Sequence, residues 1–368
     1  MKILYIILVM VHGLIHLLGF VKGFRFKEIK ELTISVSKPM GLIWLSAVIL
    51  IWTYGILYLF NPRHTWIVGI VVVAVSQTLI IIFWKDARFG TIPNILILLV
   101  SMASLGYHNY QKLVLKDTRL LVSKNVSIEN KIVNESVIHH LPEPVKNWLR
   151  NSGAIGKPYI SVGKVTQTAQ LRMKPEQERW MSATAIQHTT IDSPGFIWTV
   201  DVKMNGLINF QGRDKFESGK GEMLIKMNSL INIVHEKGEK LDEASLQRFL
   251  GEMVWFPSLA LSPYINWEPI NDTAAKATMA YKGTKGSGTF YFNSNGDVIK
   301  FSAMRFKGNR TEDVRHEWIM NITDYKTFDG IKVPARMTST WKLDKTDWTW
   351  LKLEISEIKY QFGPARLD

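Results

Sequence analysis

The segment LDEASLQRFLGEMVWFP, residues 241–257, decides the fold of the larger part of this 368-residue chain. Its apolar residues recur at nearly helical spacing, at Leu246, Phe249, Leu250, Met253 and Val254. The pattern predicts a helix over about 242–254. On both sides of it, apolar residues instead occupy every second position, which is typical of strands. The sequence therefore predicts a sheet whose strand series is interrupted by a helix.

Strand candidates on each side are separated by turn signals such as Ser-Pro-Gly, Asn-Gly and Ser-Asn-Gly-Asp. Before the helix they are ISVGKVTQTAQLRM, RWMSATAIQHTTI, GFIWTVDVKM, LINFQGRDKF and GEMLIKMNSLINIV. After it they are INWEPI, AKATMAY, GTFYFNSNGDVIKFSAMRF, VRHEWIMNITDY, KVPARMTSTWKL and DWTWLKLEISEIKYQF. Closely spaced turns imply antiparallel pairing, so we expect one large curved sheet. A short amphipathic helix is expected in LPEPVKNWLRNSG, at 141–153.

The first 110 residues have a different composition. Four stretches contain no Asp, Glu, Lys or Arg: 3–21, 39–62, 64–84 and 89–111. A bilayer core of about 30 Å needs roughly 20 apolar residues in a helix, and each stretch fits that length. We therefore expect transmembrane helices at about 3–21, 40–60, 66–84 and 91–107. A polar, irregular linker is expected over 111–136, followed by the β domain over 137–368.

The orientation in the membrane follows from the basic residues of the loops. The loops at 21–39 and 85–89 carry Lys22, Arg25, Lys27, Lys30, Lys38, Lys85 and Arg88. The opposite side has only Lys2 and Arg63. The positive-inside rule places both basic loops in the cytoplasm. With four spans, the chain is expected to be a multi-pass cell-membrane protein whose large C-terminal domain is extracytoplasmic.

Polar residues inside the expected spans form one candidate site. His12 and His16, in HGLIH, are four residues apart and share a helix face. Gln77, Asp86 and Asn94 are expected at similar depth or at the inner helix ends. Since polar groups in hydrocarbon face a partner, these five residues predict an intramembrane polar cluster. It fits either hydrogen bonding between helices or a metal, haem or proton-relay site.

The composition excludes several classes of function. The net charge of +13 is scattered as single Lys and Arg residues among acids, so a nucleic-acid partner is not expected. The chain has no cysteine, which removes disulfides, thiolate metal sites and a Cys nucleophile. The motifs GxSxG and HExxH and a Walker loop are absent from the sequence. The sequence identifies no catalytic residue and no cofactor, and it favours a non-enzymatic role.

Tryptophans are the strongest signal in the second part of the chain. Of thirteen, nine follow residue 110. On a curved sheet, inward-facing tryptophans either fill a core or line an apolar cavity. We expect the mouth of such a cavity at 248–257, where Arg248 and Glu252 are four residues apart and Trp255 follows. The pair Arg248–Glu252 fits a salt bridge on a helix surface equally well. The candidate ligand-binding residues are Arg248, Glu252, Trp255, Trp267, Arg305 and Trp341.

Three strand arginines are candidates for contact with an anionic headgroup: Arg213, Arg305 and Arg336. The alternative for each is ordinary pairing with a carboxylate. The partners considered for that pairing are Asp214, Glu317 and Glu354.

Several segments resemble an uncharacterised bacterial family of membrane-anchored proteins with a domain of unknown function. They are LPEPVKNWL, GRDKFESGKGEMLIK, LQRFLGEMVWFPSLAL, INWEPI, FYFNSNGDVIKFSAMRF and YKTFDGIKVPARMTSTW, and VHGLIHLLGF and FWKDARFGTIPN resemble its membrane part. The strand series with a helix across it is also similar to the half-barrel of LolA/LolB lipoprotein carriers and related lipid-binding domains. This second resemblance implies a half-barrel that binds lipid.

The expected fold is therefore a four-helix transmembrane region followed by a mainly antiparallel β half-barrel (α+β) with a few helices. The expected function is extracytoplasmic binding of a membrane lipid or another apolar small molecule, without covalent chemistry. Two alternatives remain open. One is a membrane metal, haem or proton-relay protein that uses His12 and His16, and the other is a cell-envelope module that presents its sheet to a protein partner.

Overall fold

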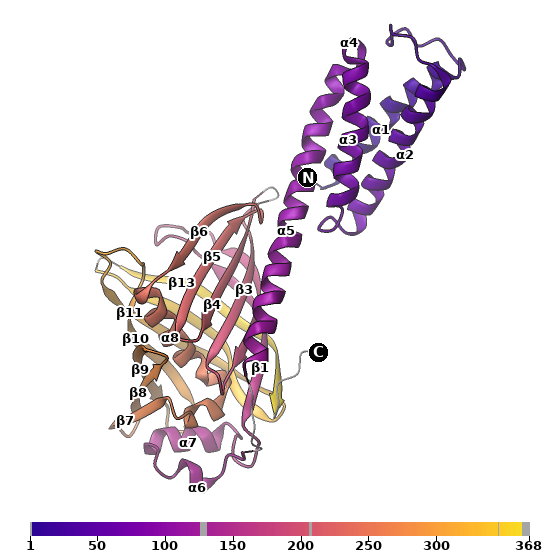
Figure 1. Ribbon diagram of the computed structural model, residues 1–368. Helices are drawn as coiled ribbons and strands as arrows, with labels where there is room; N and C mark the ends of the chain where they lie inside the picture. Colours follow the sequence, from indigo (N-terminus) through magenta and orange to yellow (C-terminus); the bar gives the residue numbers. More distant parts are fainter. Residues whose placement is uncertain (1, 126–130, 206–207, 345, 363–368) are drawn as a thin grey trace. The chain divides into compact units, whose positions relative to one another are not determined.

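The computed structural model describes residues 2–125, 131–205, 208–344 and 346–362 (Figure 1). The chain divides into two compact units. The helical unit comprises Met1–Lys112 with Asn228–Ile231, and the half-barrel unit comprises Leu113–Met227 and Asn232–Asp368.

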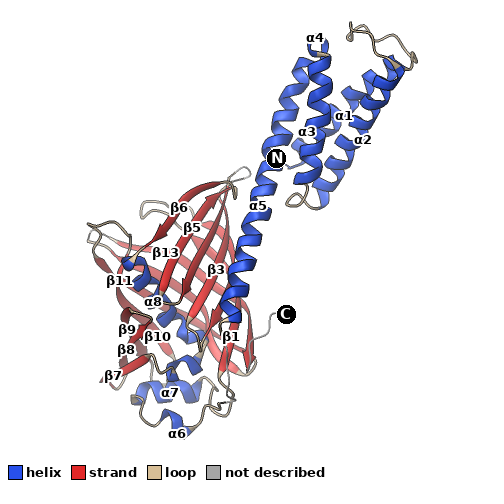
Figure 2. Cartoon of the chain, viewed as in Figure 1, coloured by secondary structure: helices blue, strands red, loops and turns tan. Residues whose placement is uncertain are grey.

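The helical unit is built from helices (Figure 2), and the long ones are apolar. Its elements are α1 (Lys2–Gly23), α2 (Lys38–Phe60), α3 (Trp66–Ile82), α4 (Trp84–Ala87), the 3₁₀ helix η1 (Arg88–Gly90) and the first part of α5 (Thr91–Ser123), up to Lys112. Three helical segments are long and apolar enough to cross a membrane: α1, α2 and Trp84–Ser123. Helix α3 is equally apolar but has only 17 residues.

Helix α5 is longer than its sequence predicts. It continues through residues 111–123, which we expected to be irregular linker, so that part of the linker prediction is wrong. The reason is tertiary: Asp117, Leu121 and Val122 are buried in the half-barrel unit. Asp117 forms an ion pair with Arg213 of strand β4. Residues 126–130 of the expected linker lie outside the described residues.

The described residues of the second unit form one 13-stranded antiparallel sheet that curls into a half-barrel (Figure 1). Its strands are β1 (Ile160–Leu171), β2 (Met181–Thr190), β3 (Gly195–Lys203), β4 (Asn209–Glu217), β5 (Lys220–Met227), β6 (Ile231–Lys237), β7 (Ile265–Asn271), β8 (Ala274–Tyr281), β9 (Thr284–Phe292), β10 (Val298–Phe306), β11 (Arg315–Phe328), β12 (Ile331–Lys342) and β13 (Asp347–Phe362). The predicted single strand GEMLIKMNSLINIV is two strands, β5 and β6. The chain turns there because Asn228 and Ser229 adopt positive φ angles of 49° and 59°.

The strand order is β6-β5-β4-β3-β2-β1-β13-β12-β11-β10-β9-β8-β7, so two meanders join through the β1–β13 pair. Strands β6 and β7 follow one another in the chain but form the two opposite edges of the sheet. The segment between them has to cross from edge to edge. It does so as α8 (Glu239–Gly251), η2 (Glu252–Trp255) and η3 (Pro257–Leu261), and α8 contacts strands of both meanders.

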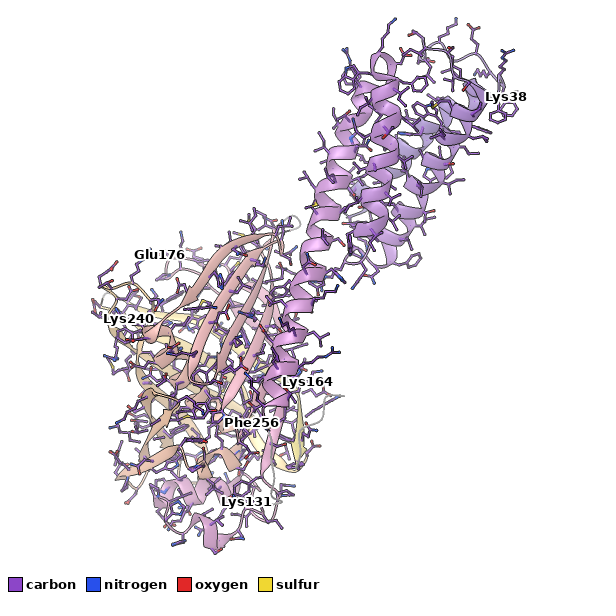
Figure 3. All side chains as sticks on the ribbon, in the orientation of Figure 1. Lys38, Lys131, Lys164, Glu176, Lys240 and Phe256 are labelled. Atoms are coloured by element: carbon purple, nitrogen blue, oxygen red, sulfur yellow. The ribbon has the colours of Figure 1, made fainter. Side chains whose placement is uncertain are left out.

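The crossing segment supplies the centre of the hydrophobic core, as its helical spacing predicts. Leu246, Phe249, Leu250 and Val254 are at most 1% exposed, and Phe256 lies in the interior of the half-barrel unit (Figure 3). The predicted helix over 242–254 is thus confirmed, with its last turn as the 3₁₀ helix η2.

The short amphipathic helix predicted within 141–153 is also confirmed, as α7 (Glu143–Asn151). It buries Val145, Trp148 and Leu149. The four-residue helix α6 (Glu135–Ile138) precedes it.

Close packing of Phe256 on strand β1 depends on a glycine. A Cβ atom at Gly163 would lie 2.0 Å from Phe256 Cε1. We expect Gly163→Val to lower the free energy of unfolding by about 1–3 kcal/mol through overpacking. Urea unfolding of the full-length protein in detergent measures this. The control is Thr168→Val, on the exposed face of the same strand. Adding Phe256→Leu to Gly163→Val should restore part of the lost stability. Equal effects of Gly163→Val and Thr168→Val would contradict close packing at Gly163.

Candidate functional site

A cavity of about 270 Å³ lies within the half-barrel unit, between α8 and the sheet. Strands of both meanders line it, together with α8 and η2. Its volume is close to the lower end of the range of about 300–1,000 Å³ for small-molecule sites. Most of the lining is apolar. Six tryptophans contribute to it: Trp198, Trp255, Trp318, Trp341, Trp348 and Trp350.

Strand register aligns three of these indoles. Trp318 on β11 pairs with Trp341 on β12, and Trp341 pairs with Trp348 on β13. Directly paired residues lie on the same face of a sheet, so the three rings form a row across the cavity wall. Trp350 follows Trp348 by two residues and therefore shares its face. We call Trp318, Trp341 and Trp348 the tryptophan row.

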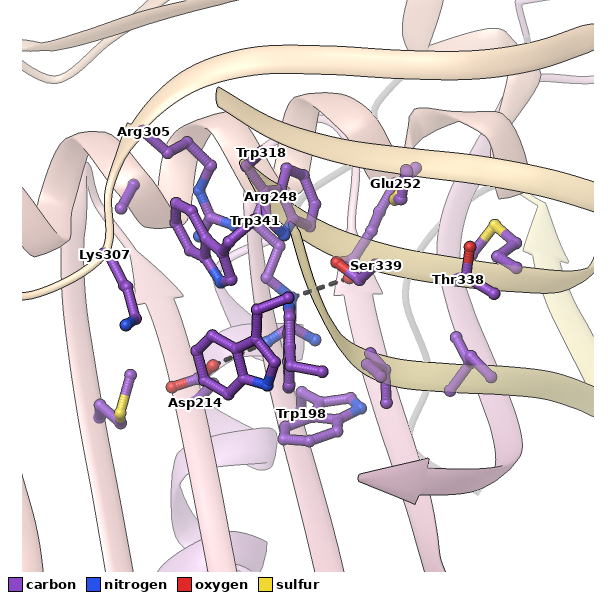
Figure 4. Close-up of a pocket in the computed structure, with 18 of the residues that line it drawn as sticks. Trp198, Asp214, Arg248, Glu252, Arg305, Lys307, Trp318, Thr338, Ser339 and Trp341 are labelled. Carbon is purple, nitrogen blue, oxygen red and sulfur yellow. Dashed lines mark hydrogen bonds and ion pairs between the residues drawn. The ribbon is translucent and has the colours of Figure 1, made fainter. Parts of the chain in front are cut away.

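Arg248 of α8 is held by three side chains, two of which, Asp214 and Glu252, also line the cavity (Figure 4). Its Nε lies 2.8 Å from Glu252 Oε1, its Nη1 lies 2.7 Å from Asp214 Oδ2, and its Nη2 donates to Gln187 Oε1 at 3.2 Å. The predicted Arg248–Glu252 pair therefore forms, but it is buried, with Glu252 only 7% exposed. Burial alone would lower the pKa of Arg248, but Glu252 and Asp214 outweigh it and raise that pKa.

Arg305 of β10 lines the same cavity in a different electrostatic setting. It is half-buried, and its guanidinium carbon lies 4.3 Å from the ring centre of Trp318 and 5.5 Å from that of Trp341. Lys307 stands at the exposed rim, with Nζ 4.7 Å from the ring centre of Trp348. Both cations thus lie over the tryptophan row. Burial, and then the charge of Arg248, lowers the pKa of Arg305 to about 9.

The other two candidate arginines make ordinary ion pairs. Arg213 pairs with Asp117 and with Glu222, whose Oε1 lies 2.7 Å from Arg213 Nη2. Arg336 is exposed and pairs with Glu354 at 3.3 Å. Among the described residues, no carboxylate forms an ion pair with Arg305.

Five of the six predicted ligand-binding residues line the cavity, and Trp267 does not. Trp267 packs on Phe290 instead and donates its Nε1–H to Ala260 O at 3.0 Å. Sequence reasoning did not select some lining residues as site residues: Trp198, Asp214, Lys307, Trp318, Trp348 and Trp350. The alternation in DWTWL, residues 347–351, places Trp348 and Trp350 on one face of the strand. Only the register across β11, β12 and β13 places them near Trp341.

In the helical unit, four of the five predicted polar residues meet. His12 Nε2 lies 3.0 Å from Asn94 Oδ1, and Asn94 Nδ2 donates to Gln77 Oε1 at 3.0 Å. Ser76 Oγ joins the group, at 2.9 Å from His16 Nε2 and 3.3 Å from His12 Nε2. The geometry is that of hydrogen bonding between helices.

Asp86 makes its hydrogen bonds elsewhere. It accepts hydrogen bonds from the backbone N–H groups of Thr33 and Ile34, at 2.6 and 3.0 Å. A second cavity, of about 510 Å³, is lined by Asp86, Glu31, His12 and His16 and otherwise mainly by apolar side chains. In the part of the chain that the structure describes, no group of three or more His, Asp and Glu side chains is placed to hold a metal ion.

These features define a half-barrel with a tryptophan-lined internal cavity, preceded by apolar helices. The chain belongs to the family of unknown function DUF6544, which it matches over residues 131–353. The resemblance to a domain-of-unknown-function family is thereby confirmed. None of the curated proteins compared matches the sequence.

Two solved structures are similar to the chain. One is a LolA superfamily protein from Nitrosomonas europaea, with 11% sequence identity and a TM-score of 0.34, covering 60% of this chain and 94% of that one. The other is a β-barrel-like protein of the domain of unknown function DUF1849 from Brucella abortus. It has 6% identity and a TM-score of 0.20, and the match covers 55% of this chain and 99% of that one.

Removing Arg248 should destabilise the half-barrel strongly. We expect Arg248→Met to cost about 3–5 kcal/mol of unfolding free energy, because it leaves the buried Glu252 and the half-buried Asp214 without their shared cation. Urea unfolding of the full-length protein measures the change. Arg315→Met is the matched control, since Arg315 pairs with Glu243 of the same helix but its side chain is 47% exposed. Its expected cost is below about 1 kcal/mol, and equal losses in the two variants would contradict the role of the buried network.

Proposed function

We propose that this protein is a membrane-anchored, extracytoplasmic binding protein for a lipid or another apolar ligand, without covalent chemistry. The observation that carries the proposal is the cavity between α8 and the sheet, lined largely by tryptophan, methionine and leucine side chains. Such rigid apolar walls around a few fixed polar groups are typical of small-molecule sites. The charged groups Arg248, Asp214 and Glu252 are bound to one another, which favours a structural role for them over proton transfer.

The cavity of the helical unit is the weaker candidate for the ligand site. Its wall includes side chains of the outer face of α1 that are about half exposed, such as Ile7, Val11 and Ile15. In a bilayer, acyl chains would cover this face. The hydrogen bonds of His12 and His16 to Ser76 and Asn94 favour helix association there.

The membrane part of the proposal rests on length, apolarity and charge. We propose that α3 crosses the membrane with the three longer segments, because its 17 residues reach the lower limit of about 17–25 for a span. The basic residues of the α1–α2 loop and of the Lys85–Arg88 region then lie in the cytoplasm, and the half-barrel lies outside it.

Filling the cavity should weaken ligand binding without unfolding the protein. Ser339 lines the cavity, and its Oγ is a buried atom without a hydrogen-bond partner among the described residues. We expect Ser339→Phe to occupy the space and to weaken binding of a fluorescent fatty acyl probe at least about tenfold, a loss of about 1.4 kcal/mol. Ser182→Phe, on the exposed face of β2, is the control. Unchanged probe affinity in a folded Ser339→Phe protein would contradict the site.

The absence of cysteine from the sequence makes the orientation directly testable. Single cysteines are introduced at two exposed positions, Ser182→Cys in β2 and Lys27→Cys in the α1–α2 loop. In intact spheroplasts, a membrane-impermeant maleimide should label Ser182→Cys alone, and Lys27→Cys should react only after lysis. The reverse pattern, or labelling of both before lysis, would refute the proposed topology.

A further inference from the structure

The cavity of the half-barrel has an excess of buried hydrogen-bond donors. Among the described residues, several of its lining residues carry a buried polar atom without a partner: Arg305 Nε, Trp318 Nε1, Trp348 Nε1, Trp350 Nε1, Gln167 Nε2 and Ser339 Oγ. All except the serine hydroxyl can only donate a hydrogen bond. Buried polar groups in native structures are nearly always paired, so a cluster of unpaired donors at one cavity calls for a ligand that accepts.

The charges of the lining point in the same direction. Its two carboxylates, Asp214 and Glu252, both bind Arg248. The remaining two charged groups of the lining are cations, Arg305 and Lys307, and the ion pairs of the described residues include neither of them. Both lie over the tryptophan row, which keeps them at the cavity wall without neutralising them.

We propose that this cavity binds a single-chain amphiphile whose head is an oxyanion, a carboxylate or a phosphate. The head would accept hydrogen bonds from Arg305 and from the indole N–H groups of Trp318 and Trp348. A carboxylate or phosphate is the acceptor that a guanidinium binds most strongly. This inference rests on the proposed function, since it names the chemical class of the ligand for the same cavity.

An amphiphile fits the lining better than a free anion does. Besides Arg305, the cavity wall includes apolar side chains from three other strands: Met223 of β5, Met320 of β11, Leu351 and Leu353 of β13. These groups offer contact to an acyl chain and nothing to an inorganic anion. Lys307, at the exposed rim, places a second cation on the solvent side of the head.

The test compares four eight-carbon probes that differ only in their heads: octanoate, octyl phosphate, 1-octanol and octylammonium. Each is titrated by calorimetry into the full-length protein in phosphatidylcholine nanodiscs, with empty nanodiscs as the blank. Octanoate and octyl phosphate should bind at least about tenfold more tightly than octanol, and octylammonium no more tightly than octanol. Arg305→Gln should abolish the preference for the two anions over octanol, and Arg305→Lys should restore part of that preference.

The matched control is Arg336→Gln, since Arg336 lies in the same sheet, on β12, two strands away from β10, but is exposed and paired with Glu354. If Arg305→Gln does not fold, Lys307→Gln and Arg305→Lys carry the test, each with a smaller expected loss. Equal binding of all four probes, unaffected by these variants, would contradict the inference that the ligand has an anionic head, but it would be consistent with the proposed function. Binding of inorganic phosphate as tight as that of octyl phosphate would contradict the inference that the ligand is an amphiphile. Failure of every probe to bind would overturn the proposed function itself.

Discussion

The crossing of α8 from one edge of the sheet to the other is the constraint on which the half-barrel depends. Strands β6 and β7 are consecutive in the chain but lie at opposite ends of a 13-strand order, so the segment between them must traverse the sheet. The apolar face of the sheet needs a cover, and the crossing segment provides it with Phe249, Leu250 and Phe256, all at most 1% exposed. Arg248 fixes the helix electrostatically, because its partners Asp214 and Gln187 belong to the sheet.

The same arrangement explains why a cavity remains. Helix α8 contacts β4, β5, β8, β9 and β10, while the tryptophan row lies on β11, β12 and β13. Indole rings are large and rigid, and space between them and the helix stays open. Each buried donor without a partner costs about 1–3 kcal/mol of stability. Several such donors lie at one cavity, and a bound hydrogen-bond acceptor would offset their cost in stability.

A buried ion pair also explains why α5 extends to Ser123. Asp117, in residues 113–123 of α5, pairs with Arg213, and Arg213 is only 3% exposed and also pairs with Glu222. Because a buried arginine without a partner is costly, this ion pair holds a polar segment in helical form. The helical unit uses neutral hydrogen bonds instead, from His12 and His16 to Ser76 and Asn94. The sequence predicts the polar cluster of the helical unit, but it does not predict the pairing of Asp117 with Arg213, because these residues are far apart in the chain.

The sequence by itself determined the elements and their faces. The period of two in DWTWLKLEISEIKYQF predicts β13, the helical spacing of Leu246, Phe249 and Leu250 predicts α8, and the uncharged stretches predict the apolar helices, because these signals are local. The tertiary structure alone decided the β1–β13 pairing, the helical end of α5 and the position of Trp267 outside the cavity. The physical reason is that register and burial are set between residues far apart in the chain. Periodicity shows which face a tryptophan occupies, but the neighbours it meets there depend on how distant strands align.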